Sequence, residues 1–154
     1  MKKLLLLGVV GLALLTGCDS KKGAFLETVD TPNNISTAID KLKTALPEKG
    51  LKLMGSIDHA KQAKDAGIRL NPEIVIMFGN PQIGAKLMQC NPSMGIDLPL
   101  RMLFSASYDG QTTITYTNPE YWSLKHNIKD KTCLAILQQA TRAMRELAQE
   151  AGKK

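Results

Sequence analysis

The sequence offers few side chains that could carry chemistry, and its two histidines come first. His59 directly follows Asp58, a residue type that caps helices, and His126 lies much further along the chain. An imidazole can bind a metal, exchange a proton or simply pack. A metal site would need both histidines and a carboxylate or thiolate ligand, which their spacing does not supply. A helix start also disfavours an added positive charge, so packing or capping is the favoured interpretation of His59.

Three further polar residues lie where predicted elements begin or where their neighbours are apolar. Asn80 stands at the start of a predicted helix, Asp97 interrupts the apolar stretch 94–100, and Tyr116 lies in a predicted strand. A partly buried carboxylate must find hydrogen-bond donors, and capping of local backbone amides is the simpler role for Asp97. Polar groups near helix amino termini can instead favour an anionic or hydrogen-bond-accepting ligand. We therefore predict a shallow polar pocket formed by His59, Asn80, Asp97 and Tyr116.

Motifs of the common enzyme classes are missing from the sequence. Ser56, Asp58 and His59 contain the residue types of a hydrolytic triad, but no G-x-S-x-G elbow accompanies them. The methionines form no short repeats, which favours core filling over copper binding. The sequence also has no phosphate-binding loop, dinucleotide fingerprint or C-x-x-C-H haem motif. We predict no cofactor and no catalysis. The alternatives are a metal or haem accessory protein that uses His59 or His126, and then a small hydrolase.

The amino-terminal segment predicts export and lipid attachment. A basic start is followed by an apolar run of 12 residues, which is too short to span a bilayer as a helix. Leu15-Thr16-Gly17-Cys18 resembles a lipobox, so we expect residues 1–17 to be removed as a signal peptide and Cys18 to carry diacylglycerol and palmitate. An ordinary secretory signal is the alternative, but the segment has no A-x-A-like cleavage site. Residues 18–23 form a short tether, and Asp19 resembles a signal for retention on the periplasmic face of the inner membrane, if the source has two membranes.

The other two cysteines, Cys90 and Cys133, would then lie in a compartment where disulfides persist. Both fall on predicted inward faces of helices, 43 residues apart (133 minus 90). We predict a disulfide between them. Two inert thiols or a redox-active pair are the alternatives, and the latter lacks a C-x-x-C spacing.

Composition and charge set the class of partner. The formal charge of +6 falls to +4 without Lys2 and Lys3, and the basic residues form no stripe interleaved with aromatics. This pattern predicts no nucleic-acid binding. The modest positive charge suits contact with anionic headgroups. We expect the membrane as partner through the lipid anchor, together with a small ligand or a membrane protein.

Periodicity and turn signals predict an α+β domain over residues 24–151. Four Asn-Pro dipeptides separate short elements, and Asp109-Gly110 predicts a tight hairpin. The predicted strands are 25–29, 51–57, 74–78, 98–105 and 112–117, and the predicted helices start near residues 35, 59, 80, 119 and 133. We expect two layers: a mostly antiparallel sheet of about five strands with helices packed on it, including a long carboxy-terminal helix.

Several short strings in a fixed order resemble a known family. They are Ile-Asp-His-Ala at 57–60, Phe-Gly-Asn-Pro at 78–81, Lys-Leu-Met at 86–88, Ile-Asp-Leu-Pro-Leu at 96–100 and Tyr-Thr-Asn-Pro-Glu-Tyr at 116–121. Together they are similar to the bacterial family known as domain of unknown function 302, over about residues 25–147. The resemblance implies a sheet with packed helices and no established activity. Ser105-Ala106-Ser107 lacks the acidic pair expected before the hairpin turn, so no role of such acids transfers here. We expect a non-catalytic ligand-binding or partner-binding module.

Overall fold

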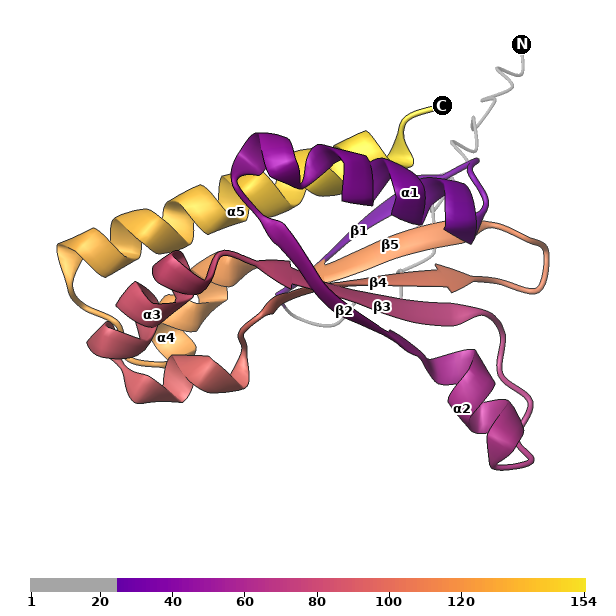
Figure 1. Cartoon of the computed structure of the whole chain (residues 1–154), viewed down its shortest axis with the longest axis horizontal. Coiled ribbons are helices and arrows are strands. Elements are labelled where there is room, and N and C mark those ends of the chain that lie inside the picture. Colours follow the sequence, from indigo (N-terminus) through magenta and orange to yellow (C-terminus); the bar gives the residue numbers. More distant parts are fainter. Residues whose placement is uncertain (1–24) are drawn as a thin grey trace, which may run out of the picture.

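The computed structural model describes residues 25–154, where a five-stranded sheet carries two long helices on one face (Figure 1). In chain order the elements are β1 Leu26–Thr31, α1 Ile35–Ala45, η1 Pro47–Lys49, β2 Lys52–Asp58, α2 His59–Asp65, β3 Glu73–Gly79, α3 Pro81–Cys90, η2 Pro92–Ile96, β4 Leu100–Ala106, β5 Thr112–Thr117, η3 Pro119–Tyr121, α4 Trp122–Lys125 and α5 Lys131–Gly152. The predicted signal segment, Cys18 and tether lie outside the described residues.

The sheet has the strand order β1-β5-β4-β3-β2, and every neighbouring pair is antiparallel. Gly110 has φ +86° in the turn between β4 and β5, as the Asp-Gly dipeptide predicted. The predicted α+β class with a five-stranded antiparallel sheet and a long carboxy-terminal helix is confirmed.

The core lies between the sheet and the helices α1 and α5. Alternate strand residues face these helices, as a half-buried antiparallel sheet requires. The hydrophobic strand residues that are at most 2% exposed are Ile76, Phe78, Met102, Phe104 and Ile114. They pack in one cluster with Leu42 of α1 and with Leu137 and Met144 of α5. The apolar stripe predicted for the last helix therefore faces the sheet.

Asparagine caps begin the short helices at one end of the sheet. Asn80, Asn91 and Asn118 each precede a proline, and each side-chain oxygen accepts a hydrogen bond from a backbone N–H two residues further on. Proline suits the first helical position because its missing donor would have no partner there. These caps start α3, η2 and η3, which gather with α4 beyond the ends of the central strands. The fourth dipeptide, Asn71-Pro72, leads instead into β3.

Helix α2 lies at the opposite end of the sheet from α3 and α4 (Figure 1). Of the helices in residues 25–154, none has the length and apolar composition that a membrane crossing requires.

Candidate functional site

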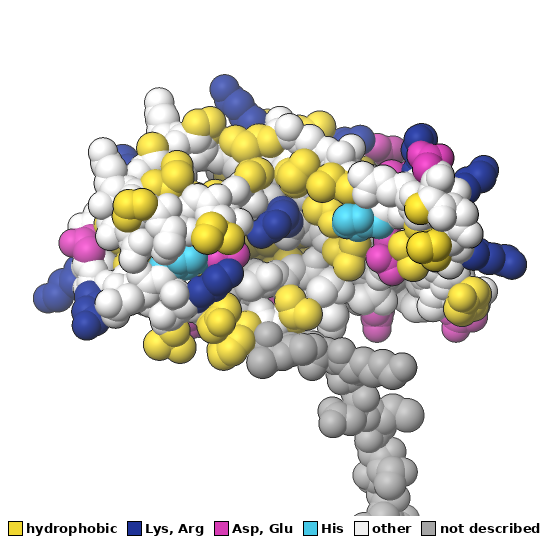
Figure 2. All heavy atoms as spheres, turned by 90° about the horizontal axis from the view of Figure 1, so that it is seen from below, with side chains coloured by type: hydrophobic (Ala, Val, Ile, Leu, Met, Phe, Trp, Pro, Cys, Tyr) yellow, Lys and Arg dark blue, Asp and Glu magenta, His cyan; other side chains and the backbone are white. Residues whose placement is uncertain are grey.

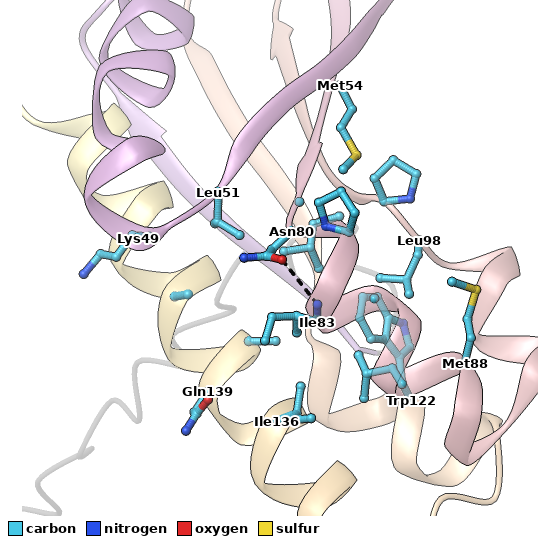
Figure 3. A pocket seen from close by; sticks show the side chains of 18 of the residues that line it. Lys49, Leu51, Met54, Asn80, Ile83, Met88, Leu98, Trp122, Ile136 and Gln139 are labelled. Atoms are coloured by element: carbon cyan, nitrogen blue, oxygen red, sulfur yellow. Dashed lines mark hydrogen bonds between the residues drawn. The ribbon is translucent and has the colours of Figure 1, made fainter.

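A largely apolar cavity of about 530 Å³ opens where α3, α5 and the ends of the central strands meet (Figure 3). The apolar side chains that define it include Ile83, Met88, Leu98, Trp122, Ile136 and Ala140. α3 and α5 form two walls of the cavity, and the segment before β4 forms a third. Apolar walls around a volume of this size are typical of small-molecule sites.

Two polar side chains at the rim of this cavity, Lys49 and Asn80, have internal partners. The side-chain oxygen of Asn80 accepts from the backbone N–H groups of Gln82 (3.0 Å) and Ile83 (3.3 Å), and its amide donates to the Gly50 carbonyl (3.1 Å). Lys49 forms a salt bridge with Glu146, whose hydrogen bond and negative charge raise the pKa of Lys49. Gln139 of α5 is a third polar residue of the lining and is exposed.

Trp122 contributes a buried polar atom without a partner. Its side chain lines the cavity and is 4% exposed, and its indole N–H has no hydrogen-bond partner among residues 25–154. A buried donor without an acceptor costs about 1–3 kcal/mol. The nitrogen itself is closed to solvent, so the indole presents its apolar part to the cavity.

Beside the cavity lies a buried polar network, the Asp97 cluster, formed by Asn91, Ser93, Asp97, Lys125 and His126. The Asp97 carboxylate accepts from Lys125 Nζ at 2.9 Å and lies 2.5 Å from His126 Nε2. The second ring nitrogen, His126 Nδ1, lies 2.6 Å from Ser93 Oγ. Residues of η2 and α4 are thus joined through one carboxylate and one imidazole.

Asn91 completes this cluster. Its side-chain oxygen accepts from Ser93 Oγ at 2.8 Å, and its amide donates to the His126 carbonyl at 2.7 Å. Burial by itself raises the pKa of Asp97, but the hydrogen bonds from Lys125 and His126 outweigh it and the pKa is lowered. Both ring nitrogens of His126 are engaged, so metal binding there would require these contacts to break.

The Asp97 cluster contains a serine, a histidine and an aspartate in one hydrogen-bonded row. This row differs from the grouping of Ser56, Asp58 and His59 noted in the sequence. Asp58 instead caps α2, where its carboxylate accepts from the Lys61 N–H at 2.8 Å. The hydroxyl of Ser93 is held by Asn91 as well as by His126. The row therefore has the residue types of a hydrolytic triad within a closed structural network.

The structure does not gather His59, Asn80, Asp97 and Tyr116 around one cavity, so the predicted shared pocket is corrected. Asp58 pairs with Ile74 and Lys52 pairs with Gly79. His59 and Asn80 consequently lie at opposite ends of the β2–β3 pair, about 20 Å apart at roughly 3.4 Å per residue. Figure 2 shows the histidine side chains as two separate patches.

Tyr116 and Asp97 also lie apart from His59. Tyr116 is 6% exposed in β5, two strands away from β3, and burial raises the pKa of its hydroxyl. Asp97 does not cap the local amides, as the simpler interpretation proposed, because its carboxylate binds Lys125 and His126. Among the four residues, only Asn80 lines the apolar cavity. The prediction overestimated how far polar groups at element ends converge in an antiparallel sheet.

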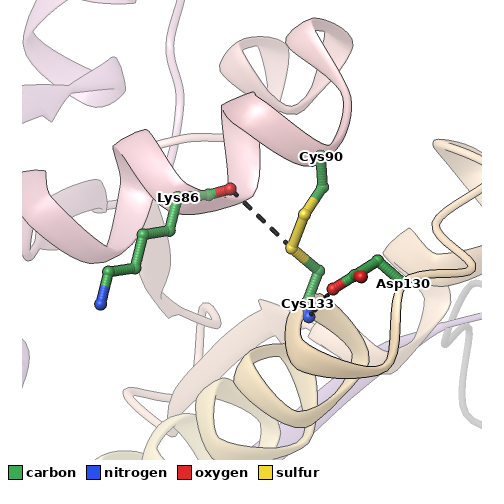
Figure 4. Close-up of a disulfide and its surroundings, with 4 residues drawn as sticks. All are labelled: Lys86, Cys90, Asp130 and Cys133. Atoms are coloured by element: carbon green, nitrogen blue, oxygen red, sulfur yellow. Dashed lines mark hydrogen bonds between the residues drawn. A yellow bond between two sulfur atoms is a disulfide. The ribbon is translucent and has the colours of Figure 1, made fainter.

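Cys90 and Cys133 are joined in the structure, with their Cα atoms 6.7 Å apart (Figure 4). The disulfide links the end of α3 to the start of α5, the two helices that wall the cavity. Asp130 caps α5 by accepting from the Cys133 N–H at 2.9 Å. Within residues 25–154, these three residues are the one group whose possible metal-ligand atoms lie within 4.8 Å of one another. Both sulfurs are taken up by the disulfide.

Sequence reasoning missed Ser93, Lys125 and Trp122. Ser93 follows Asn91-Pro92, and this cap motif could have indicated that its backbone and hydroxyl serve Asn91. No local signal pairs Lys125 with Asp97, because the two lie 28 residues apart. Trp122 is the single tryptophan, and its role in the cavity follows only from the packing of α4.

Comparison with known proteins gives a match over most of the chain. Residues 27–151 match the family model described as domain of unknown function DUF302. A crystal structure of an uncharacterized conserved DUF302 protein from Bacillus stearothermophilus superposes with a TM-score of 0.74 at 19% identity, covering 84% of this chain and 99% of that one. That likeness concerns the fold alone.

Curated relatives share a stretch of 111 residues at 32% identity. They are named fluoride-specific ion channel FluC 1 of Brucella suis biovar 1 (strain 1330), and FluC 1 of Brucella abortus biovar 1 (strain 9-941). The stretch covers 72% of this chain but 44% and 41% of those two relatives. The chain therefore spans less than half the length of the curated relatives it matches.

Proposed function

The chain belongs to the DUF302 family, and from this premise we propose that it is a lipid-anchored, non-catalytic module that binds a largely apolar small ligand. The observation that carries this proposal is the apolar cavity of about 530 Å³ between α3 and α5. Ligand sites are typically concave, mostly apolar and of this volume, and this cavity opens to solvent so that a ligand can enter.

The anchor part of the proposal rests on the sequence. Leu15-Thr16-Gly17-Cys18 has the residue types and the position of a lipobox behind a basic and apolar leader. Cys18 would carry the lipid, and Asp19 favours the periplasmic face of the inner membrane in a two-membrane envelope. The partner of this protein is then first of all the membrane.

The chemistry of the cavity indicates the ligand class. Its walls are apolar, and the side chains of Lys49 and Asn80 at its rim are held by Glu146 and by backbone groups. Binding energy would come mainly from apolar contact, at about 0.8 kcal/mol per buried methylene. A medium-length alkyl chain or a similar apolar body suits these walls.

The Ser93 hydroxyl donates to Asn91 and not to the imidazole, so His126 is not placed to take the serine proton, and this supports binding over catalysis. A metal or haem accessory role of His59 or His126 is the alternative, and a small hydrolase follows it. For His126 a metal would have to replace Ser93 or Asp97 at the ring nitrogens. The ion-channel name of the curated relatives describes proteins more than twice as long as the shared stretch, so it is not carried over.

Photo-cross-linking in membranes tests the ligand proposal. The full chain is reconstituted in vesicles and irradiated with dodecanol and lauric acid that carry a diazirine in the alkyl chain. We expect labelled peptides from Ile83–Met88 of α3 and from Ile136–Ala143 of α5, because these segments form the two walls. Excess unlabelled dodecanol should remove the labelling.

Two phenylalanine substitutions on α5 make the test specific. Ala140→Phe places a ring in the cavity and should abolish cross-linking, whereas Ala135→Phe adds the same ring at an exposed position of the same helix and should not. Labelling that is spread over the whole chain, or that survives in Ala140→Phe, would contradict the proposal.

A further inference from the structure

We propose that one surface of the domain, the Leu124 face, docks on the phospholipid bilayer. This face consists of the apolar side chains of Phe25, Ile96 and Leu124 and the cationic side chains of Arg101 and Lys125. The inference rests on the lipid anchor proposed above, but it does not require a ligand in the cavity.

The apolar members of the Leu124 face are unusually exposed. Leu124 is 74% exposed, Ile96 is 72% exposed and Phe25 is 49% exposed. A single exposed apolar residue is ordinary and needs no explanation. A group of them beside a membrane attachment point is a different case, because exposed apolar groups indicate membrane or protein contact.

Printed contacts bring these residues together. The ring of Phe25 stacks on Tyr121 with centroids 4.0 Å apart, and Leu124 follows Tyr121 by three residues, about one helical turn. Lys125 binds Asp97, the direct neighbour of Ile96. Phe25, Leu124 and Ile96 therefore lie around the same η2–η3–α4 end of the domain.

The charge around this face suits anionic headgroups. The side chains of Arg101 and Lys125 are 52% and 38% exposed, while the Asp97 carboxylate between them is 11% exposed. The cations are thus more accessible than the acid that they contact. Glu120 is an exposed acid on η3 and partly offsets them. Figure 2 shows the mixed character of this side, with Lys and Arg side chains beside hydrophobic ones.

The short tether between Cys18 and Phe25 favours the membrane as the partner that contacts the Leu124 face. Cys18 precedes Phe25 by seven residues, which span at most about 25 Å when fully extended. The Phe25 carbonyl accepts from the Asn118 N–H at 2.8 Å, so the chain enters the domain at the Leu124 face. A lipid on Cys18 therefore keeps this face close to the bilayer surface.

A second exposed apolar pair provides a matched control. Ile68 and Leu70 are 63% and 41% exposed in the turn after α2. With α2, this turn connects β2, the edge strand opposite β1, to β3 near Ile74. Across the sheet, Ile74 pairs with Phe104, Phe104 pairs with Ile114, and Ile114 pairs with Val29, which lies three residues beyond Leu26 in β1. The α2 turn therefore lies diagonally across the sheet from the point where the chain enters.

A tryptophan introduced at Leu124 reports docking directly, because position 124 is 74% exposed on this face, whereas the native Trp122 is 4% exposed in the cavity and supplies only a background signal. The full lipidated chain is placed in phosphatidylcholine–phosphatidylglycerol vesicles whose acyl chains carry bromine close to the headgroup. Bromine quenches tryptophan fluorescence only at short range. We expect clear extra quenching in Leu124→Trp over the native chain, at least a twofold loss of that extra quenching when Ile96→Asp is added, and no extra quenching in Ile68→Trp.

Fractionation of the same samples separates the two proposals. Leu124→Trp that sediments with the vesicles but shows no more bromine quenching than the native chain would overturn docking and leave the anchor and the cavity proposals standing. Equal extra quenching in Leu124→Trp and in Ile68→Trp would also overturn it. Native chain that fails to sediment, or Cys18→Ser that sediments like the native chain, would overturn the anchor and docking together. Cavity cross-linking is read separately in each case.

Discussion

The apolar cavity and the Asp97 cluster are neighbours built from the same short elements, yet they differ in how their groups are satisfied. Leu98 and Trp122 line the cavity, while Asp97 and Lys125 lie next to them in the chain or within the same turn. In the cluster, polar side chains bind one another at 2.5–2.9 Å. At the cavity, apolar walls border open space. The polar side chains of the cluster are thus paired with one another, and the open region is apolar.

This difference suggests that the cluster and the cavity have different roles. The cluster joins η2 to α4 through Asp97 and His126, and so it fixes the segments that carry Leu98 and Trp122. The disulfide fixes the other two walls by joining α3 to α5. We infer that the polar cluster and the disulfide position the cavity, and that the ligand contacts neither.

Removal of the disulfide should have the largest effect on stability. It should loosen the cavity walls α3 and α5 and leave the Asp97 cluster in place. The double variant Cys90→Ser with Cys133→Ser opens a loop of 43 residues, and the chain-entropy estimate predicts a loss of about 4 kcal/mol in the free energy of unfolding. Urea unfolding of the native chain and the variant measures this loss. The native chain under reductant serves as the control and should match the variant. Two free thiols in denatured, unreduced native protein would show that the bond does not form.

Loss of the Asp97 carboxylate should have the next largest effect. Asp97→Ala leaves Lys125 and His126 without their shared acceptor, and breaking a buried ion pair from one side costs about 3 kcal/mol. Half-exposed Lys125 can turn to water, so the buried imidazole of His126 bears most of this cost. Thermal unfolding measures the change. Asp40→Ala removes an exposed carboxylate and should change the stability by less than about 0.5 kcal/mol. An equally small effect of Asp97→Ala would contradict the positioning role of the cluster.

The same carboxylate should give the cluster a defined dependence on pH. The pKa of Asp97 is lowered from 3.8 in the folded chain, so the folded state binds its proton less readily than the unfolded state. The stability that Asp97 contributes is therefore fully present above about pH 4 and is lost as the pH falls through the lowered folded pKa. The stability difference between the native chain and Asp97→Asn should shrink below pH 4. A difference that stays constant from pH 7 to pH 2 would contradict the charged state of Asp97.

The sequence predicted the fold well because its signals are local. The step of Cys133, Leu137 and Met144 along α5 and the Asp109-Gly110 turn each depend on residues within a few positions. The Asn80 cap before Pro81 is local in the same way. Each of these features was found in the structure at the predicted place.

The candidate site could not be predicted in the same way because it depends on contacts between distant residues. Asp97 and His126 lie 29 residues apart, and their pairing follows from the docking of α4 against η2. The cavity is a property of unfilled volume between α3 and α5, which periodicity does not describe. The pairing of β2 with β3 also separates residues of the predicted pocket. An antiparallel pair of seven-residue strands places His59 and Asn80 at opposite ends.

A smaller effect should come from Gly84, which lies in α3 on the cavity side. A Cβ at this position would lie 3.5 Å from Leu98 Cδ1, an ordinary contact, and alanine favours a helix over glycine by about 0.5–1 kcal/mol. Gly84→Ala should therefore raise the free energy of unfolding by about that amount while it narrows the cavity. Gly55→Ala is the control, because its Cβ would lie 3.0 Å from Met77 Cε and the neighbour must move, so we expect no gain. Urea unfolding compares both variants with the native chain. Destabilisation by Gly84→Ala would mean that Leu98 and α3 already pack as tightly as the Asp97 cluster, which would remove the contrast between the two regions.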